Sequence, residues 1–215
     1  MNETLTPLIR YLGHQEYALV FEQMRQFTKT RNKDTEDELW IVEHPPVFTL
    51  GLGASLENIL DPHSIAVVQT DRGGEVTYHG PGQIVVYFLL DLKRNASKRL
   101  LARELVYQIE EAVLATLSTY HVKGMRKEKA PGIYIGDGES QGKKIAALGL
   151  KIQHNGYTYH GVALNVDMDL TPFSWIHPCG YLGLVTTDMR SQGIKETKEE
   201  IQATFIKHIL EKVIH

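Results

Sequence analysis

The stretch Arg72-Gly73-Gly74-Glu75-Val76-Thr77-Tyr78-His79-Gly80-Pro81-Gly82-Gln83 holds four glycines, a proline, two oppositely charged side chains, a histidine and a tyrosine. Glycine adopts backbone dihedral angles that other residues avoid, and it lets the backbone approach a ligand closely. An apolar run, residues 84–90, follows directly and predicts a strand buried on both faces. We therefore interpret residues 72–83 as a ligand-binding loop laid against a buried strand. A tight glycine turn with incidental polar residues is the alternative.

On either side of this loop the sequence predicts short strands, with helices toward the two ends of the chain. Apolar residues three and four positions apart predict helices over residues 14–29 and 98–119, and a closing helix that begins at the capping-box pair Thr197 and Glu200. Apolar and β-branched runs bounded by glycine, proline or Asn-Gly predict the strands. No repeat or linker is visible, so we expect one α+β domain over residues 1–215. The predicted strands are residues 39–42, 47–50, 65–70, 84–90, 130–135, 143–153 and 157–166.

Composition and charge exclude several classes of protein. The 215 residues are 42% hydrophobic and 23% charged with a net charge of −3, which is ordinary for a globular protein and argues against general nucleic-acid binding. Cys179 is the only cysteine, so no intrachain disulfide forms, which suits a reducing compartment. The N-terminus lacks signal-peptide features, and no apolar run approaches the roughly 20 residues of a membrane span. We expect a cytoplasmic protein that does not contact membranes.

Cys179 is the candidate nucleophile. It lies in His177-Pro178-Cys179-Gly180, outside any periodic apolar face, although a lone cysteine is often just a small buried hydrophobic residue. A reactive cysteine needs a partner that removes or stabilises the thiol proton. The sequence offers His177, His79, His160 and Lys144 as partners and does not choose among them.

Lys144 stands at the end of a row of apolar side chains. In its predicted strand, the residues of the same parity are all apolar, whereas the opposite row ends in Lys151 and reaches solvent. A lysine on the apolar face is expected to be partly desolvated, which favours the neutral, basic amine. The alternative is a lysine whose charged head reaches solvent at the strand end.

Metal and nucleotide sites are not expected. A zinc site from His79, His160, His177 and Cys179 would lack any pair with zinc-ligand spacing, and the chain has a single cysteine. Residues 142–144, Gly-Lys-Lys, lack the preceding glycine and the hydroxyl of a phosphate loop. We therefore predict no metal and no cofactor.

Three blocks over residues 40–190 together resemble the lipoyl(octanoyl) transferases of lipoate biosynthesis. Residues 72–83 resemble the acyl-binding loop of that family, and Lys144-Ile145-Ala146-Ala147-Leu148-Gly149 resembles its lysine motif. Residues 159–166, Tyr-His-Gly-Val-Ala-Leu-Asn-Val, running on to Pro178-Cys179-Gly180, resemble its cysteine segment. Two departures are Glu75, where the family pattern has glutamine, and Val162, where it has leucine.

The resemblance implies a fold, an activity and a set of site residues. The fold would be a mixed β-sheet flanked by helices, similar to the catalytic domains of biotin and lipoate protein ligases. Cys179 would take an octanoyl group from octanoyl-acyl carrier protein as a thioester, with Lys144 as its acid–base partner, and pass it to a lipoyl-domain lysine. Glycines of the site would admit the acyl chain and donate N–H groups to the oxyanion. The acyl site would comprise Arg72, Gly73, Gly74, Glu75, Val76, Thr77, Tyr78, His79, Ala147, Leu148, Gly149, Gly161, Val162 and Ala163.

The implied partners are acyl carrier protein as donor and, as acceptors, the lipoyl domains of 2-oxoacid dehydrogenase complexes and the glycine cleavage H protein. We expect a monomer. Rival interpretations are an ATP-dependent lipoate or biotin ligase, a transferase with another donor and acceptor, and a non-catalytic acyl-binding module. Two basic groups are candidate docks for the acidic carrier: Lys123, Arg126, Lys127 and Lys129, and Lys93, Arg94, Lys98 and Arg99. For the first group a solvated loop is the favoured interpretation.

Overall fold

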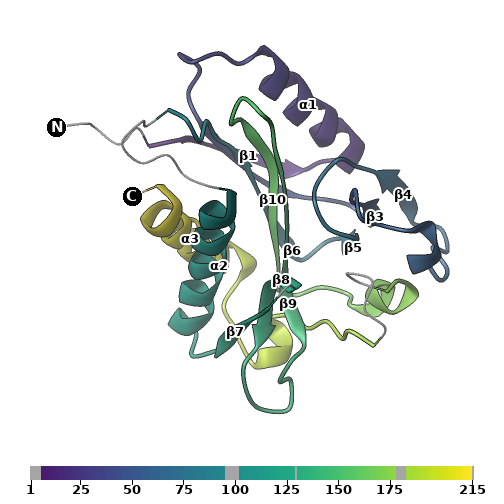
Figure 1. Ribbon diagram of the computed structural model, residues 1–215. Coiled ribbons are helices and arrows are strands. Elements are labelled where there is room, and N and C mark those ends of the chain that lie inside the picture. Colours follow the sequence, from purple (N-terminus) through teal and green to yellow (C-terminus); the bar gives the residue numbers. More distant parts are fainter. Residues whose placement is uncertain (1–5, 95–101, 129, 178–182, 215) are drawn as a thin grey trace.

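The computed structural model describes residues 6–94, 102–128, 130–177 and 183–214. Figure 1 shows the path of the chain. In chain order the elements are β1 (Leu8–His14), α1 (Tyr17–Thr30), β2 (Glu38–Glu43), β3 (Val47–Leu50), η1 (Leu56–Asn58), β4 (Ala66–Gln69), β5 (Val76–His79), β6 (Gln83–Leu89), α2 (Ala102–Thr119), β7 (Gly124–Lys127), β8 (Ala130–Ile135), β9 (Lys144–Ile152), β10 (Thr158–Asn165), η3 (Thr171–Trp175), η5 (Arg190–Gln192), α3 (Lys198–Ile209) and η6 (Leu210–Ile214).

Two sheets organise the described residues. Seven strands form a mixed sheet in the order β1-β2-β6-β10-β9-β8-β7, in which only β1 and β2 run parallel. Three strands form a second sheet in the order β4-β3-β5. In Figure 1, α2 and α3 cover one face of the large sheet, while α1 and the second sheet lie on the other side. The fold is therefore the expected mixed sheet flanked by helices.

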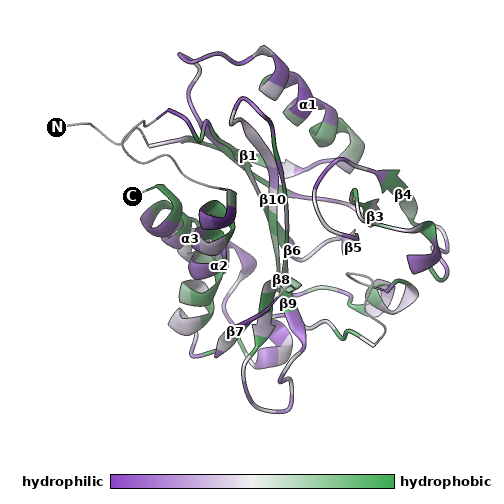
Figure 2. Cartoon of the chain, in the orientation of Figure 1, coloured by the Kyte–Doolittle hydropathy of each residue, from purple (hydrophilic) through white to green (hydrophobic). Residues whose placement is uncertain are grey.

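Alternation along the central strands divides the core into two layers. In β6, Ile84, Val86 and Phe88 join the layer under α2 and α3. Val85, Tyr87 and Leu89 of the same strand pack toward α1. All seven residues of β6 are buried, which confirms the predicted strand with two covered faces. Figure 2 shows the resulting hydrophobic colouring along the central strands.

Most predicted elements are present, and the capping box of Thr197 and Glu200 begins α3 as expected. Residues 98–101 of the second predicted helix lie outside the described residues. Three strands were not predicted. The N-terminal strand β1 is largely exposed, and its apolar residues do not alternate regularly with polar ones. Strand β5 occupies the middle of the stretch interpreted as a loop, because Val76 and Tyr78 turn into the core of the second sheet.

The basic group at residues 123–129 was predicted to lie in a solvated loop, and this prediction is wrong for its central residues. They form strand β7, which pairs with β8. Arg126 pairs with Glu110 and Glu111 of α2, Lys123 with Asp137, and Lys127 donates to the carbonyl of Gly142. Side chains that bind their own chain are less available to a partner protein. Lys129 lies outside the described residues.

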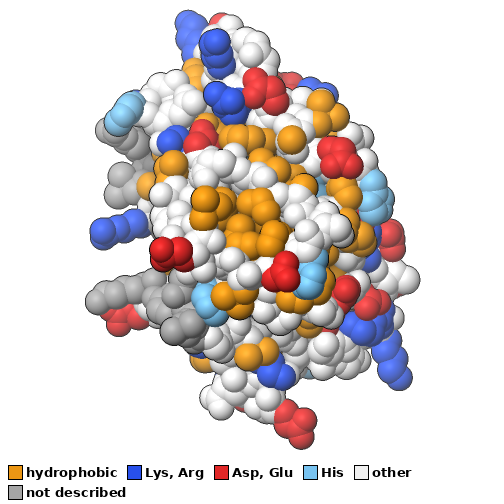
Figure 3. All heavy atoms as spheres, turned by 90° about the vertical axis from the view of Figure 1, so that its right-hand side faces the viewer, with side chains coloured by type: hydrophobic (Ala, Val, Ile, Leu, Met, Phe, Trp, Pro, Cys, Tyr) orange, Lys and Arg blue, Asp and Glu red, His pale blue; other side chains and the backbone are white. Residues whose placement is uncertain are grey.

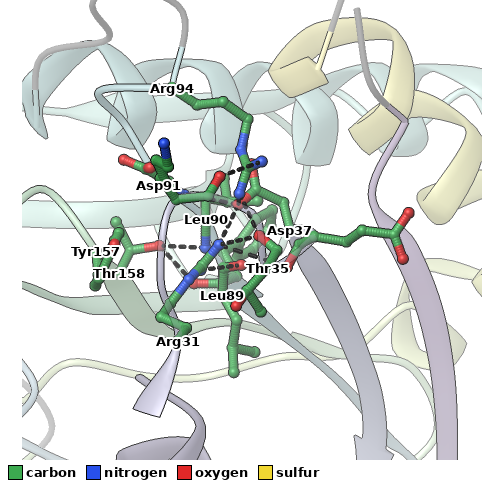
Figure 4. Close-up of polar contacts among 12 residues, drawn as sticks. Arg31, Thr35, Asp37, Leu89, Leu90, Asp91, Arg94, Tyr157 and Thr158 are labelled. Carbon is green, nitrogen blue, oxygen red and sulfur yellow. Dashed lines mark hydrogen bonds and ion pairs between the residues drawn. The ribbon is translucent and has the colours of Figure 1, made fainter. Parts of the chain in front are cut away.

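A buried arginine ties α1 to the large sheet (Figure 4). The side chain of Arg31 is fully buried, and its Nη1 donates to the carbonyl of Leu89 at 2.8 Å. Its Nη2 donates to Oδ1 of Asp37 at 2.6 Å, and the same carboxylate oxygen accepts from the backbone N–H of Asp91 at 2.9 Å. One ion pair therefore joins the end of α1 to the start of β2 and the end of β6.

Replacing Arg31 is expected to be costly, because Asp37 would lose its buried cation. We expect Arg31→Ala to lower the free energy of unfolding by about 3–5 kcal/mol, as measured by urea denaturation. The matched control is Arg25→Ala in the same helix, where the pair with Glu22 is solvent-exposed. The control should change stability by less than about 1 kcal/mol. Equal effects of the two substitutions would contradict a structural role for the buried pair.

Candidate active site

A cavity of about 660 Å³ lies where the segment before and within β5 faces β9 and β10. Lys144 and most of the predicted acyl-site residues line it. Figure 3 views the molecule from the side of the second sheet, and apolar side chains gather near the centre of that face. The cavity lining therefore combines three separate blocks of sequence. The predicted acyl-site residues that line it are Arg72, Gly73, Gly74, Glu75, Val76, Thr77, His79, Ala147, Leu148, Gly149, Gly161, Val162 and Ala163.

Tyr78 is the predicted acyl-site residue that does not line the cavity. Its ring packs against Phe48 and Phe173 in the core of the second sheet. In β5 successive side chains point to opposite faces. Val76 and Tyr78 both belong to that core, but Val76 also lines the cavity, together with Thr77 and His79. Contact of Tyr78 with an acyl chain stays a prediction from the resemblance.

The glycine-rich segment, residues 72–83, is hydrogen-bonded to both sheets. The backbone N–H of Gly73 donates to the carbonyl of Leu150 in β9 at 2.9 Å. The buried guanidinium of Arg72 donates through Nη2 to the carbonyl of Thr49 in β3 at 2.7 Å and to the Thr49 hydroxyl at 2.9 Å. A Cβ on Gly149 would lie 2.8 Å from the carbonyl oxygen of Gly73, so glycine there permits the contact.

This geometry corrects part of the predicted use of glycine. The N–H of Gly73 is already bonded to Leu150, so it is not available to an acyl oxygen. A Cβ on Gly161 would lie 1.9 Å from the carbonyl oxygen of Val86 in the neighbouring strand. Gly161 is therefore required for strand packing in the large sheet. The positions of Gly73, Gly149 and Gly161 therefore support close packing between segments of the protein better than N–H donation to an acyl oxygen.

Buried histidines form the polar floor of the site. His79 shares a 2.7 Å hydrogen bond between Nδ1 and Oε1 of Gln83, and Gln83 donates to Oδ1 of Asn165 at 2.9 Å. Nε2 of His160 lies 2.9 Å from Oδ1 of Asp71, and Oδ2 of the same carboxylate accepts from the hydroxyl of Tyr159. Burial lowers the pKa of His79 to about 3, so this imidazole is neutral near pH 7.

His44 extends this floor below the cavity. It precedes Pro45 and comes directly after β2, which ends at Glu43. His44 is fully buried, with Nε2 2.8 Å from the hydroxyl of Tyr87 and Nδ1 2.7 Å from the carbonyl oxygen of Gln15. Burial lowers the pKa of His44 to about 4. Because these histidines are buried and neutral, they shape the site without adding charge to it.

Lys144 is buried at the first position of β9, with 4% of its surface exposed, so the prediction of a desolvated lysine is confirmed. Its Nζ donates to the carbonyl of Pro131 at 2.9 Å. Its backbone N–H donates to the carbonyl of Val185, and its carbonyl accepts from the N–H of Thr187, both at 2.9 Å. These bonds tie the lysine to the segment that follows the predicted cysteine loop.

Cys179 lies outside the described residues, so its contact with Lys144 stays a prediction. Two of the alternative partners, His79 and His160, line the cavity, while His177 does not. Within the described parts of the chain, no three histidine, cysteine or acidic side chains gather in a metal-binding arrangement. Nor is any described helix both long and apolar enough to cross a membrane.

Sequence reasoning missed other residues of the cavity wall. Tyr17 of α1, Asn165 of β10 and Pro131 of β8 also line the cavity. Within the predicted strand of residues 130–135, the Pro131-Gly132 dipeptide was the available sequence signal. Gly132 has a φ of +115°, and a Cβ there would lie 2.7 Å from Cε of Lys144. The glycine therefore makes room for the lysine stem.

Comparison with known proteins gives the family. The description "Lipoyl protein ligase A/B catalytic domain" belongs to the family model that matches residues 16–210. The chain belongs to this family. An octanoyltransferase of Herminiimonas arsenicoxydans is 60% identical over 210 residues, covering 97% of each chain. An octanoyltransferase of Janthinobacterium sp. (strain Marseille) is 62% identical over 203 residues, covering 94% of each. The resemblance inferred from three motifs is thereby confirmed.

Solved structures agree with this family fold. A crystal structure of lipoate-protein ligase A bound with ATP aligns with a TM-score of 0.77 and 14% identity, covering 97% of this chain and 86% of that one. Biotin protein ligase from Aquifex aeolicus, in complex with biotin and ATP, aligns with a TM-score of 0.59 and 12% identity, covering 97% and 71%. At these identities the likeness shows the fold alone, and it confirms the predicted fold class.

The buried histidines predict loss of stability in acid. Between the folded pKa values of about 3 and 4 and the ordinary value of 6.5, the unfolded chain binds more protons than the folded chain. The free energy of unfolding should therefore fall as the pH drops below about 6.5, by about 2.5 kcal/mol per pH unit near pH 5. Urea denaturation at several pH values measures this slope.

Two variants test this pH dependence of stability. His79→Asn removes a buried histidine, and the control, His154→Asn, removes an exposed one. His79→Asn should remove about one proton per molecule from the pH dependence between pH 4.5 and 6. An unchanged slope in that variant would contradict the assignment of His79 as a buried neutral group.

Gly132 gives a second test of the geometry. In Gly132→Ala the new Cβ would lie 2.4 Å from the carbonyl oxygen of Ala146 and 2.7 Å from Cε of Lys144. The control is Gly138→Ala, which has a φ of +70° but no atom within 4 Å of the new Cβ. We expect the control to cost about 1 kcal/mol of unfolding free energy and Gly132→Ala about 3 kcal/mol or more. Equal losses in urea denaturation would show that backbone conformation alone matters at Gly132.

Proposed function

We propose that this protein transfers an octanoyl group from octanoyl-acyl carrier protein to a lysine of lipoyl domains, the first step of protein lipoylation from an endogenous acyl donor. The observation that carries the proposal is 60–62% identity, over nearly the full length, to relatives named octanoyltransferases. The cavity supports it, because an eight-carbon chain gains about 0.8 kcal/mol for each CH₂ that it buries. The acceptors would be the lipoyl domains of 2-oxoacid dehydrogenase complexes and the glycine cleavage H protein.

In the proposed first step, the thiolate of Cys179 attacks the carbonyl carbon of the donor thioester. The carbon–sulfur bond to the carrier's thiol breaks, and an octanoyl-cysteine thioester forms. In the second step, the ε-amine of the acceptor lysine attacks this thioester and an amide forms. The carbon–sulfur bond to Cys179 breaks, and the proton lost by the amine passes to the departing thiolate of Cys179. Thioester exchange is nearly neutral and amide formation is downhill, so the reaction needs no nucleotide. Free carrier thiol and octanoylated lipoyl domain are the products.

The proposed role of Lys144 is proton transfer. Its amine would accept the thiol proton of Cys179 before attack and return a proton to the departing thiol. Such a base must reach the thiol and must be shielded from bulk water. Burial of Lys144 and its place on the cavity wall support this role. Neutral histidines beneath the cavity would then shape the site, with proton transfer left to the lysine.

Glu75 gives the rim of the site a charge that the family pattern lacks. Its carboxylate lies 3.4 Å from Nδ2 of Asn58, and it lines the cavity while partly exposed. A rim carboxylate would meet either the carrier's arm or the acceptor lysine.

We place this reaction in the cytoplasm, because a protein with a single cysteine suits a reducing compartment. The enzyme would act as a monomer.

The deciding experiment mixes the protein with octanoyl-acyl carrier protein, without ATP, and follows intact mass. We expect an octanoyl adduct on Cys179 that a lipoyl-domain acceptor removes. Lys144→Ala should slow adduct formation by about a hundredfold or more while the protein stays folded, because general acid–base catalysis contributes about that much. Cys179→Ser should form no thioester adduct.

Other results would change the proposal. A requirement for ATP would favour the ligase interpretation, which needs no cysteine nucleophile. Transfer that persists in the Cys179 variant would exclude the acyl-cysteine route. A near-normal rate for Lys144→Ala would return the base role to a histidine of the cavity.

A further inference from the structure

Behind Lys144 lies a buried carboxylate that does not line the cavity. Glu110 of α2 has 8% of its surface exposed. Its Oε1 accepts a hydrogen bond from the backbone N–H of Gly132 at 2.9 Å. Its Oε2 accepts from Nε of Arg126 at 2.8 Å. Glutamate is rarely buried unless it is paired, so this placement has a cost that the two bonds offset.

The N–H that Glu110 binds and the carbonyl that Lys144 binds belong to one peptide group. The peptide group between Pro131 and Gly132 is planar, with its C=O and N–H pointing in opposite directions. The carbonyl of Pro131 accepts from Nζ of Lys144, and the N–H of Gly132 donates to Glu110. Glu110 therefore fixes the orientation of the group that receives the lysine.

This peptide group would turn easily without such a partner. Gly132 has no side chain to restrict it and adopts a φ of +115°. Rotation of the group would point the carbonyl of Pro131 away from Nζ of Lys144. A charged acceptor holds an N–H more strongly than a neutral one, and it polarises the carbonyl at the other end of the group. A carboxylate suits this position for both reasons.

Arg126 completes the arrangement. Its guanidinium carbon lies 4.2 Å from the centroid of the Tyr107 ring, and its Nη2 donates to the carbonyl of Tyr107 at 3.0 Å. It also pairs with Glu111 at 2.7 Å, a carboxylate whose side chain is 35% exposed. From β7, the cation is thus held against α2 in a fixed position beside Glu110. Glu111 shares this cation but lies on the solvent side, which makes it a matched control.

We infer that Glu110 is a positioning residue for Lys144: through the Pro131–Gly132 peptide group it sets where the lysine amine stands in the cavity. The inference rests on the proposed function only in giving Lys144 a role in proton transfer. Glu110 itself touches neither the cavity nor a reacting atom. Its loss should therefore reduce the rate of the chemical step and leave donor binding unchanged.

The test compares Glu110→Ala and Glu110→Gln with Glu111→Gln, using octanoyl-acyl carrier protein and a lipoyl-domain acceptor. We expect Glu110→Ala to lower kcat about ten- to hundredfold per folded molecule, with KM for the donor within about twofold, because a small displacement of a reacting group costs this much. Glu110→Gln should lose less, about three- to tenfold, because its amide oxygen still accepts from Gly132. Glu111→Gln should stay within about twofold.

A second arm separates positioning from a general loss of structure. Adduct formation on Cys179 is followed over hours by intact mass, so that slow variants remain measurable, and melting temperatures are recorded. If Glu110 acts through Lys144, adding Glu110→Ala to Lys144→Ala should slow adduct formation by less than about twofold further. An equal slowing in both backgrounds would overturn the inference.

The remaining outcomes are also decisive. If Glu110→Ala does not fold, Glu110→Gln carries the test, and a kcat equal to that of Glu111→Gln overturns the inference. A KM effect without a kcat effect would overturn it too. Failure of the proposed function looks different, because wild-type protein would then form no adduct, or Lys144→Ala would match the wild-type rate whatever Glu110 does.

Discussion

The attachment of the glycine-rich segment to the edge of β9 is the contact on which the rest of the site depends. One backbone hydrogen bond, from Gly73 to Leu150, joins this segment to the large sheet. The guanidinium of Arg72 joins it to β3 of the second sheet. A backbone donor and a buried cation both have to be satisfied, so neither sheet can move away without leaving a polar group unpaired. The space left between them is the cavity.

Polar groups around the cavity are arranged at two depths. At the floor, burial lowers the pKa of the histidines, which are bonded to Gln83, Tyr87 and Asp71. At the wall, Lys144 is enclosed by the backbone of Pro131 and Gly132, with the ion pair of Glu110 and Arg126 behind it. The ion pair of Glu110 and Arg126 thus lies behind the lysine and outside the cavity lining, whereas Arg72 and Glu75 are charged residues of the lining itself.

Short-range patterns were reliable where local chemistry and tertiary packing agree. The buried strand of residues 84–90, the Asn-Gly hairpin and the capping box of Thr197 and Glu200 all follow from a few neighbouring residues. Strand β5 was missed because glycines surround it, and the alternation of Val76 and Tyr78 covers only four residues. Strand β7 was missed because its basic side chains suggest solvent, whereas Arg126 is held by two carboxylates of α2.

By itself, the sequence determined the helices, most strands, the three motif blocks and hence the family, because these depend on residue types and their spacing along the chain. Only the tertiary structure decided that the blocks meet around one cavity, that Tyr78 turns away from it and that the N–H of Gly73 is already bonded. It also revealed the role of Glu110. From the sequence alone, a glutamate on this helix would be expected to face solvent. Its partner Gly132 lies on another element, and only the packing of α2 against β8 brings the two together.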